Sequence, residues 1–296
     1  MDSTGFQALF EQFAVATPPR TIVRVRGEKA LAFLHDVATS DLAALRPGEG
    51  AATCFLDEKG RVQAEARVLA LDDGSALLDA EPAAAGYLTG WLARIAPLSG
   101  CEVTDETAAW QVAAVRGPKA GVAMGLAADL PEHAFVQRDS QLLVRVEWGL
   151  PGFDVFSPSP EQLVLDDAIR VDDETFEAAR IAAGRPRFGI DITEETLVNE
   201  TPLLARAVAM TKGCYPGQES VARVHNLGKI RRHLVGLDLA VPASVAPGAA
   251  VLVGEDEVGV VTSAAGSAAI ARARADVKAG ATVKVDGTEA VVRALG

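Results

Sequence analysis

One short stretch of the chain carries an unusual density of reactive side chains: Lys212-Gly213-Cys214-Tyr215-Pro216-Gly217-Gln218-Glu219. Within this octapeptide, Pro216 sets φ to about −65° at the second position of a turn, and Gly217 can take the positive φ that a type II turn requires next. We therefore predict a sharp reversal with exposed backbone N–H groups. Lys212 adds a charge suited to carboxylate or phosphate, and a neighbouring cation lowers the pKa of a thiol such as that of Cys214.

Three interpretations of the octapeptide remain open at this level. In the first, it is an anion-binding turn with a reactive thiol. In the second, it is a tight loop in which Cys214 is only a small buried hydrophobic residue. In the third, Cys214 and His225 form a thiolate pair, although their separation along the chain says nothing about geometry.

The segment from Lys212 to His233 is basic, whereas the whole chain has a formal net charge of −12. An acidic chain is a poor general nucleic-acid coat, because phosphate binding depends on Lys and Arg. Such a segment is often a solvated face, but beside the octapeptide we interpret it as anion-binding. Its charged residues are Lys212, Arg223, Lys229, Arg231 and Arg232, opposed by Glu219.

Length and composition limit the class of protein. The 296 residues suffice for one large domain or two to three smaller ones. No run of eighteen apolar residues occurs, and the amino terminus lacks the early Arg or Lys of a targeting segment, so we expect a cytoplasmic protein without a membrane span. The three cysteines, Cys54, Cys101 and Cys214, form no C-x-x-C pair, and the four histidines lie far apart, so no disulfide framework or metal site is predicted.

The order of predicted elements indicates an α+β fold with antiparallel sheets, because meanders alternate with helices. The pattern Ser159-Pro160-Glu161-Gln162 also predicts a helix start. The main predicted elements are a strand at 22–26, a helix at 30–37, a meander over 51–80, a helix at 84–95, strands at 101–104 and 110–115, a helix at 118–129, a hairpin at 135–146 and a helix at 174–183 ended by Gly184.

After Arg232 the chain changes to short apolar stretches separated by turn residues such as Pro247-Gly248 and Asp286-Gly287. Short strands at even spacing predict a small β-barrel. We therefore expect two domains: residues 1–232, an α+β region with two subdomains, and residues 233–296, a C-terminal β-barrel.

The octapeptide resembles the Lys-Gly-Cys-Tyr-x-Gly-Gln-Glu signature of the YgfZ-type folate-binding proteins, which are relatives of the T-protein aminomethyltransferase of glycine cleavage (GcvT). The resemblance spans roughly residues 21 to 239. Three further stretches agree with that family in the same order: Phe33-Leu34-His35-Asp36-Val37-Ala38-Thr39-Ser40-Asp41-Leu42, Arg116-Gly117-Pro118-Lys119-Ala120, and Arg180-Ile181-Ala182-Ala183-Gly184-Arg185-Pro186 with Gly189-Ile190-Asp191.

The resemblance implies a T-protein-like fold and a cofactor that is tetrahydrofolate or a one-carbon derivative. It marks Cys214 as a candidate reactive thiol only. The glutamate tail of the folate would be bound by Lys212 and Arg223, with Arg231 or Arg232. The folate-binding residues implied by the matching motifs are Arg180, Lys212, Gly217, Gln218, Glu219 and Arg223.

Two functions follow from the resemblance. The first is a tetrahydrofolate-binding accessory protein that supports assembly or repair of iron–sulfur enzymes, including those that thiolate tRNA. Its partners would be iron–sulfur proteins or their assembly factors. The second is a folate-dependent aminomethyl or methyl transferase. Whether the chain is an enzyme stays open, with the accessory function favoured.

That preference rests on missing carboxylates. The T-protein-like enzymes carry an acidic pair where this chain has Gln63 and Ala64, a pterin-binding Glu where it has Leu150, and another Glu where it has Ala182. Glu65 is the nearest carboxylate, and a one-residue shift along a strand turns a side chain to the other face. A transferase needs a group that guides proton movement. A scaffold without ligand is a third possibility, but it has no need for the octapeptide.

Overall fold

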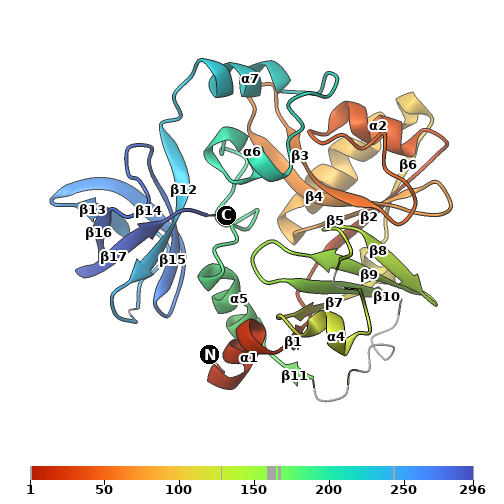
Figure 1. Cartoon of the computed structure of the whole chain (residues 1–296). Helices are drawn as coiled ribbons and strands as arrows, with labels where there is room; N and C mark the ends of the chain where they lie inside the picture. Colours follow the sequence, from red (N-terminus) through yellow and green to blue (C-terminus); the bar gives the residue numbers. More distant parts are fainter. Residues whose placement is uncertain (1, 128, 159–164, 166–167, 243, 296) are drawn as a thin grey trace.

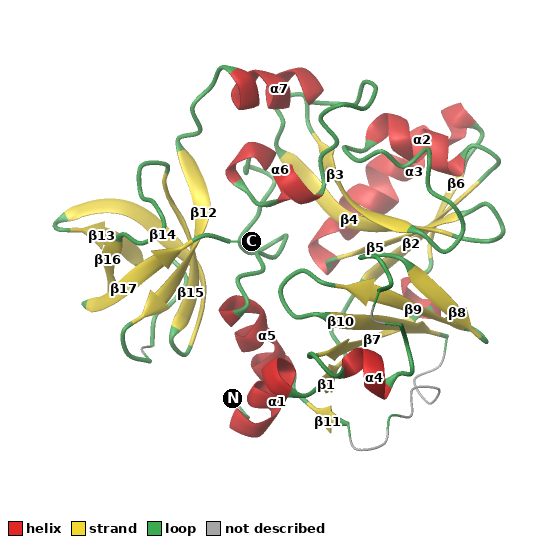
Figure 2. Ribbon diagram, viewed as in Figure 1, coloured by secondary structure: helices red, strands yellow, loops and turns green. Residues whose placement is uncertain are grey.

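The computed structural model describes residues 2–127, 129–158, 165, 168–242 and 244–295. The chain forms two sheets with covering helices and a closed barrel, so the predicted α+β class is confirmed (Figures 1 and 2). The helix start predicted at Ser159 to Gln162 lies outside the described residues.

The first sheet has five strands in the order β3-β4-β5-β2-β6, all paired antiparallel. Side chains alternate along β4, so that Val62, Ala64, Ala66 and Val68 are buried in the largest core. Helix α2 (Ala30–Val37) adds Phe33 and Leu34 to the same core. The strands are β2 (Thr21–Arg26), β3 (Gly50–Leu56), β4 (Val62–Ala70), β5 (Ala76–Ala80) and β6 (Glu102–Asp105).

The helix predicted at 84–95 is present as a mixed helical segment rather than one α-helix. It runs through η1 (Pro82–Ala84), the π-helix η2 (Tyr87–Leu92), α3 (Ala93–Ile95) and η3 (Ala96–Ser99). Its apolar face still enters the core through Leu88 and Leu92. The hydroxyl of Thr89 donates to the carbonyl of Ala85, a contact that bends helices.

The second sheet has six strands in the order β11-β1-β7-β10-β9-β8. The sequence analysis missed β1, β10 and β11, and it missed helix α1 (Ser3–Glu11), which packs against helix α5 (Asp173–Ala182). The helix predicted at 118–129 is only α4 (Ala120–Ala123), which is followed by the left-handed Gly125. The strands are β1 (Ala14–Ala16), β7 (Gln111–Arg116), β8 (Phe135–Arg138), β9 (Gln141–Val146), β10 (Gly152–Ser157) and β11 (Ile169–Arg170).

Helices between the sheets and the barrel carry the chain from one part to the other (Figure 1). Helix α5 (Asp173–Ala182) begins at Asp172, whose carboxylate accepts from the backbone N–H of Thr175, and Gly184 follows it at φ 72° as predicted. The remaining short helices are η4 (Thr107–Ala109), η6 (Val198–Glu200), α6 (Leu203–Arg206) and α7 (Gln218–Asn226).

The C-terminal barrel is closed, in the order β12-β15-β14-β13-β16-β17, as the sequence predicts. It contacts the rest of the chain through α5, since Arg293 of β17 donates to the carbonyls of Ile181 and Ala182. The division into domains at 232 and 233 stays a prediction. The strands are β12 (Arg232–Leu239), β13 (Ala250–Val253), β14 (Asp256–Ala265), β15 (Ala268–Arg274), β16 (Thr282–Val285) and β17 (Thr288–Arg293).

Within the described ranges, none of the helices combines the length and the apolar character needed to cross a bilayer.

Candidate functional site

The octapeptide forms the predicted turn and packs on the first sheet. The backbone N–H of Gln218 donates to the carbonyl of Tyr215 at 3.2 Å, and Gly217 has φ 83° and ψ −6°. A Cβ atom at Gly217 would lie 2.4 Å from the carbonyl oxygen of Asp57. Glycine is therefore required where this turn meets the turn between β3 and β4.

The ammonium group of Lys212 is hydrogen-bonded to the backbone of the same chain. Its Nζ donates to three backbone carbonyls: those of His35, of Ala38 at 2.7 Å and of Ser40 at 3.1 Å. An ammonium has three N–H donors, so each donor has a partner at the C-terminal end of α2. Burial lowers the pKa of Lys212, while Asp41 and Asp36 oppose the change. Lys212 thus stabilises the end of α2, and its contact with folate stays a prediction.

Of the other octapeptide residues, Tyr215 is buried in the core, whereas Cys214 and Glu219 are exposed. The side-chain amide of Gln218 donates to the carbonyl of Lys212 at 3.4 Å, and Arg223 pairs with Glu219 at 2.6 Å, both of them exposed. Cys214 is exposed, whereas Cys54 and Cys101 are buried. The roles proposed for these residues toward folate also stay predictions.

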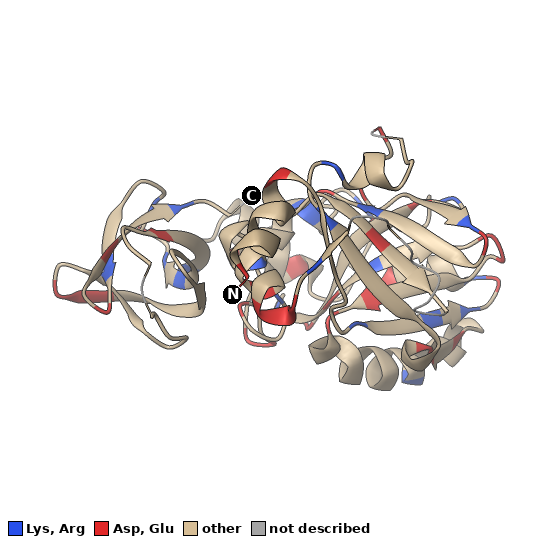
Figure 3. Cartoon of the chain, turned by 90° about the horizontal axis from the view of Figure 1, so that it is seen from below, with Lys and Arg blue, Asp and Glu red and all other residues tan. Residues whose placement is uncertain are grey.

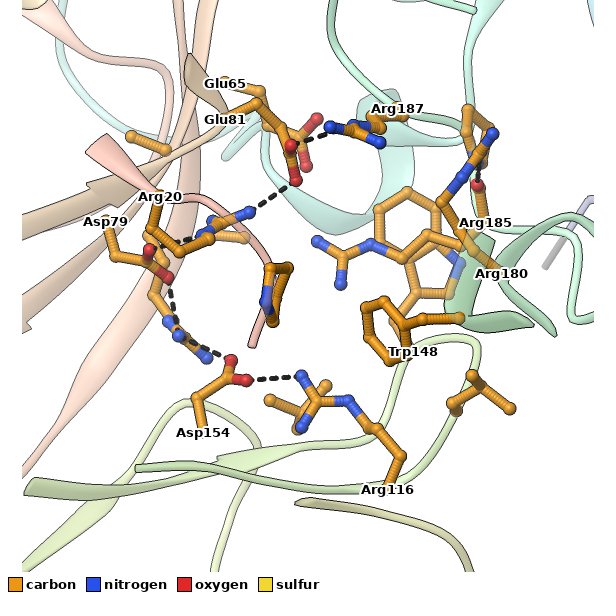
Figure 4. A pocket seen from close by; sticks show the side chains of 18 of the residues that line it. Arg20, Glu65, Asp79, Glu81, Arg116, Trp148, Asp154, Arg180, Arg185 and Arg187 are labelled. Atoms are coloured by element: carbon orange, nitrogen blue, oxygen red, sulfur yellow. Dashed lines mark hydrogen bonds and ion pairs between the residues drawn. The ribbon is translucent and has the colours of Figure 1, made fainter. Parts of the chain in front are cut away.

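A cavity of about 210 Å³ lies between the two sheets and α5 (Figure 4). One water molecule needs about 10 to 15 Å³ of such volume, so the cavity has the size of a ring-containing ligand. Of the predicted site residues, Arg180 lines it and Lys212, Gly217, Gln218, Glu219 and Arg223 do not. Its charged lining consists of seven arginines (20, 67, 116, 180, 185, 187, 206) and seven acids (Glu65, Asp79, Glu81, Glu132, Asp154, Asp173, Glu177).

One part of this lining is a buried chain of ion pairs that joins the sheets. Asp154 of β10 accepts from Arg67 of β4 at 2.7 Å and from Arg116 of β7 at 2.5 Å. Arg67 also pairs with Asp79 of β5 at 2.6 Å, and Asp79 in turn accepts from Arg20. Burial alone would raise the pKa of Asp154, but the arginines outweigh it and hold that pKa well below its usual range.

A second group of pairs surrounds Arg180. Its guanidinium binds Glu177 at 2.7 Å and the fully buried Asp191 at 2.8 Å. Arg187 contacts both Glu81, at 2.9 Å, and Glu177, at 3.2 Å. Arg180 therefore holds α5 against the segment that follows it, and a direct folate contact by Arg180 stays a prediction.

Glu65 and Arg185 differ from the rest of the charged lining. In the part of the chain that the structure describes, neither the Glu65 carboxyl nor the Arg185 guanidinium has a hydrogen bond or an ion pair. The Arg185 guanidinium lies 5.3 Å from the ring centre of Trp148 and extends toward the middle of the cavity (Figure 4). Burial raises the pKa of Glu65, and Arg185 opposes that rise.

A third feature is His133, at the edge of the cavity. Its backbone has φ 68°, an uncommon conformation for a residue other than glycine, and its buried Nδ1 has no hydrogen-bond partner. Burial, together with Arg67, lowers the pKa of His133 to about 4, although Glu132 pulls in the opposite direction. The imidazole is therefore neutral at physiological pH.

Four residues stand where the T-protein-like enzymes carry carboxylates, and the structure shows the surroundings of each. Ala64 is buried in the core, whereas Glu65, the next residue along β4, lines the cavity. Leu150 is buried and lines the cavity, Ala182 packs against the core, and the side-chain amide of Gln63 donates to the carbonyl of Glu194.

Sequence reasoning also missed the charged residues inside apolar strands. Arg67, Asp79, Arg116 and Asp154 each stand among apolar neighbours in a strand. A charged group is rarely buried unless it is paired, so a single charge within an apolar strand is a usable signal for a buried network. The partners of each charge could not be assigned from that signal.

Comparison with known proteins agrees with the fold. Residues 20–141 match the family model of the GCVT N-terminal domain. The structure resembles aminomethyltransferase T of the glycine cleavage system from Bartonella henselae, with a TM-score of 0.81 and 21% identity over 98% of this chain and 87% of that one. The family model thus covers the first part of the chain, and the structural likeness shows a shared fold.

Two curated relatives align with most of this chain at 27% and 28% identity. A provisionally named chloroplastic transferase of Arabidopsis thaliana is 27% identical over 261 residues, which are 82% of this chain and 60% of the plant protein. The aminomethyltransferase of Mycobacterium tuberculosis is 28% identical over 263 residues, covering 81% of this chain and 69% of the enzyme. The chain thus spans well under the full length of these relatives.

Proposed function

We propose that this GcvT-like chain binds tetrahydrofolate, or a one-carbon derivative of it, in the cavity between the two sheets. The observation that carries the proposal is the pair of unpartnered groups, Glu65 and Arg185, in a cavity whose other arginines have acidic partners. Burying a charge without a partner costs free energy, so a bound ligand that supplies the missing partners is favoured. The fold, shared with an aminomethyltransferase T, supports the choice of ligand.

The residues present fit a reduced folate. A reduced pterin carries N–H donors and a carbonyl acceptor on a flat ring, which match a carboxylate and a guanidinium in kind. Trp148 and Leu150 supply apolar surface to the same cavity. When bound, the folate supplies a carrier nitrogen for a one-carbon unit. The residues of this chain bind the ring, orient it and keep water from it.

The subfamily, the cellular role and the partners of this chain are also proposals. We infer that the chain is of the YgfZ type and acts in the cytoplasm as an accessory protein for iron–sulfur assembly or repair, with iron–sulfur proteins or assembly factors as partners. The octapeptide supports this assignment, as do Leu150 and Ala182 at positions where the enzymes carry Glu. A test is the activity of an iron–sulfur enzyme in cells that lack the protein, with and without the wild-type chain.

A calorimetric titration tests folate binding and its location together. Tetrahydrofolate and 5-formyltetrahydrofolate are titrated into wild type, Trp148→Ala and Arg223→Ala. If the cavity is the site, Trp148→Ala weakens binding roughly 10-fold or more, since stacking on an aromatic ring is worth about 1 to 3 kcal/mol. Loss of binding in Arg223→Ala alone would instead locate the ligand at the basic segment.

A folate-dependent aminomethyl transferase is the second candidate. Glu65 favours it, because an uncompensated carboxyl beside the reacting ligand is a group able to move a proton. The relatives named aminomethyltransferase favour it as well. A transfer assay with glycine-cleavage components distinguishes the candidates: turnover that is lost in Glu65→Gln supports the transferase, and tight folate binding without turnover supports the accessory protein.

A further inference from the structure

We propose that Thr262 and Ser263 of the C-terminal barrel are positioning residues for the cavity, and that they act on it through Asp191. The described residues that line the cavity all lie between Pro18 and Arg206, so none of them comes from the barrel. The barrel therefore sets the geometry of a binding site that it does not itself line. This inference rests on the proposed function and adds how the arginines of that site are kept in position.

Two consecutive hydroxyl groups of β14 bind one carboxylate. Neighbouring residues of a regular strand face opposite sides of the sheet. The register between β14 and β15 shifts between Val261 and Ser263, which places Thr262 at a β-bulge. A bulge redirects side chains in this way. The hydroxyls of Thr262 and Ser263 both donate to Oδ1 of Asp191, that of Ser263 at 2.6 Å.

Asp191 is a buried carboxylate with both of its oxygens occupied. Whereas Oδ1 accepts from the barrel hydroxyls, Oδ2 accepts from the guanidinium of Arg180 at 2.8 Å and from the backbone N–H of Arg187 at 2.9 Å. A carboxylate offers about four acceptor positions, so the barrel fills half of those at Asp191. The Asp191 side chain has no exposed area, so removal of a hydroxyl leaves a buried acceptor without its donor.

The same contacts fix the part of the lining that follows α5. The Arg180 guanidinium donates to the carbonyl of Arg185, and the backbone N–H of Arg185 donates to the carbonyl of Arg180 at 3.2 Å. Ser263 joins this group directly, since its hydroxyl oxygen accepts from the Arg180 guanidinium at 3.0 Å. Arg180, Arg185 and Arg187 all line the cavity (Figure 4). The barrel hydroxyls thus lie one step behind three of the arginines of the site.

The barrel is also attached to α5 independently of Asp191. Arg293 of β17 donates to the carbonyls of Ile181 and Ala182, at 3.0 Å in each case, and α5 packs against β14 and β15. Loss of the Thr262 and Ser263 hydroxyls therefore leaves these attachments of the barrel in place and removes only the donors to Asp191 and the acceptor for Arg180.

Variants of the full chain that lack the hydroxyls test the inference. Thr262→Val and the double variant Thr262→Val with Ser263→Ala are compared with the wild type by calorimetric titration with tetrahydrofolate. We expect the double variant to bind roughly 10-fold more weakly, since residues that orient a binding group are worth about 10- to 100-fold in affinity at metal sites. Thr262→Ser keeps the hydroxyl and should bind as the wild type does.

Matched control variants lie at exposed positions. Thr282→Val and Ser267→Ala remove hydroxyls from exposed residues of the barrel. Asp191→Asn removes the charge that the hydroxyls bind, and Glu195→Gln is its control, because Glu195 pairs with Arg61 at an exposed position away from the cavity lining. We expect Asp191→Asn to weaken binding at least as much as the double variant, and the three controls to bind as the wild type does.

Hydrogen exchange of the ligand-free chain, measured by mass spectrometry, gives a readout that does not depend on folate. The backbone N–H groups of Arg185 and Arg187 are hydrogen-bonded within this group of residues. In the double variant, exchange over residues 185–192 should be roughly 10-fold faster than in the wild type, because hydrogen bonds to charged groups are lost and local opening becomes easier. Exchange over β3 and β4 should not change, which distinguishes a local effect from a global loss of stability.

The outcomes separate the inference from the proposed function. If the double variant binds tetrahydrofolate as tightly as the wild type, the barrel hydroxyls do not position the site and the inference fails, while the proposed function stands. Unchanged exchange over residues 185–192 overturns the inference as well. If the wild type binds no tetrahydrofolate, the proposed function is removed, and the exchange result alone then decides whether the barrel holds this segment in position.

Discussion

Glu65 illustrates the conflict between stability and binding at one residue. Its pKa in the folded chain is raised above the ordinary 4.5 by burial, so the folded state binds its proton more tightly than the unfolded state does. The free energy of unfolding contributed by this group then falls as pH rises from 4.5 through the raised value. Above the raised pKa the ionised carboxylate therefore destabilises the folded state.

We therefore expect Glu65→Gln to raise the melting temperature at pH 7, and the gain over wild type to shrink as pH is lowered toward 4.5. Thermal unfolding at several pH values, with Glu195→Gln measured beside it, checks this. A lower melting temperature for Glu65→Gln at pH 7 would mean that Glu65 has a stabilising partner after all.

The pKa of His133 is shifted in the opposite direction to that of Glu65, so its effect on stability against pH also has the opposite sign. Its pKa is lowered from 6.5 to about 4 in the folded chain, so the unfolded chain binds the proton more tightly between those values. Stability contributed by the neutral imidazole is present above pH 6.5 and is lost as pH falls toward 4. His133→Asn keeps a residue that tolerates positive φ and removes the titration. We expect a shallower loss of unfolding free energy between pH 6.5 and 4 in denaturant titrations of His133→Asn; equal slopes would contradict the assignment.

Among the elements, the turn at Tyr215–Gln218 is the one whose conformation followed most directly from sequence. Pro216 followed by Gly217 specified it, and Gly217 has the positive φ that was predicted. Gly217→Val should cost more than about 1 kcal/mol, because a β-branched residue is strained at positive φ and its Cβ would meet the carbonyl of Asp57. Chemical unfolding measures this cost. An unchanged midpoint would show that the turn can rearrange freely.

Helix α5 depends on a buried carboxylate beyond its own end. Asp191 accepts from Arg180, from the backbone N–H of Arg187 at 2.9 Å and from Ser263 of the barrel at 2.6 Å. Asp191→Ala leaves the Arg180 charge without this partner, and breaking a buried pair costs about 3 to 5 kcal/mol. We expect a large drop in unfolding free energy, with no measurable change for the exposed Asp276→Ala. A small effect of Asp191→Ala would mean that Glu177 alone satisfies Arg180.

Elements with a strong local pattern could be predicted from the sequence, and those without one could not. Helix α2 and the barrel strands were predicted, because apolar residues recur there at a clear period. Helix α7 was not, since Val221 is its one buried residue and the octapeptide was interpreted only as a turn. The π-helical segment η2 kept the predicted apolar face but not the predicted hydrogen bonding.

At the scale of the whole molecule, the cavity could not be predicted, because its walls come from segments far apart in the chain. Arg67 pairs with Asp154 only once the two sheets pack together. Glu65 comes under the electrostatic influence of Arg185 only once the segment after α5 lies along the same cavity. Positively and negatively charged residues accordingly lie interleaved over the centre of the molecule (Figure 3). The Lys212 to Glu219 octapeptide lies outside this cavity.

The most direct measurement is a crystal structure of the full chain soaked with 5-formyltetrahydrofolate. The account predicts density for the ligand inside the cavity between the two sheets, in contact with Glu65 and Arg185. Density for the ligand at the Lys212 to Glu219 turn, with the cavity holding only water, would contradict it.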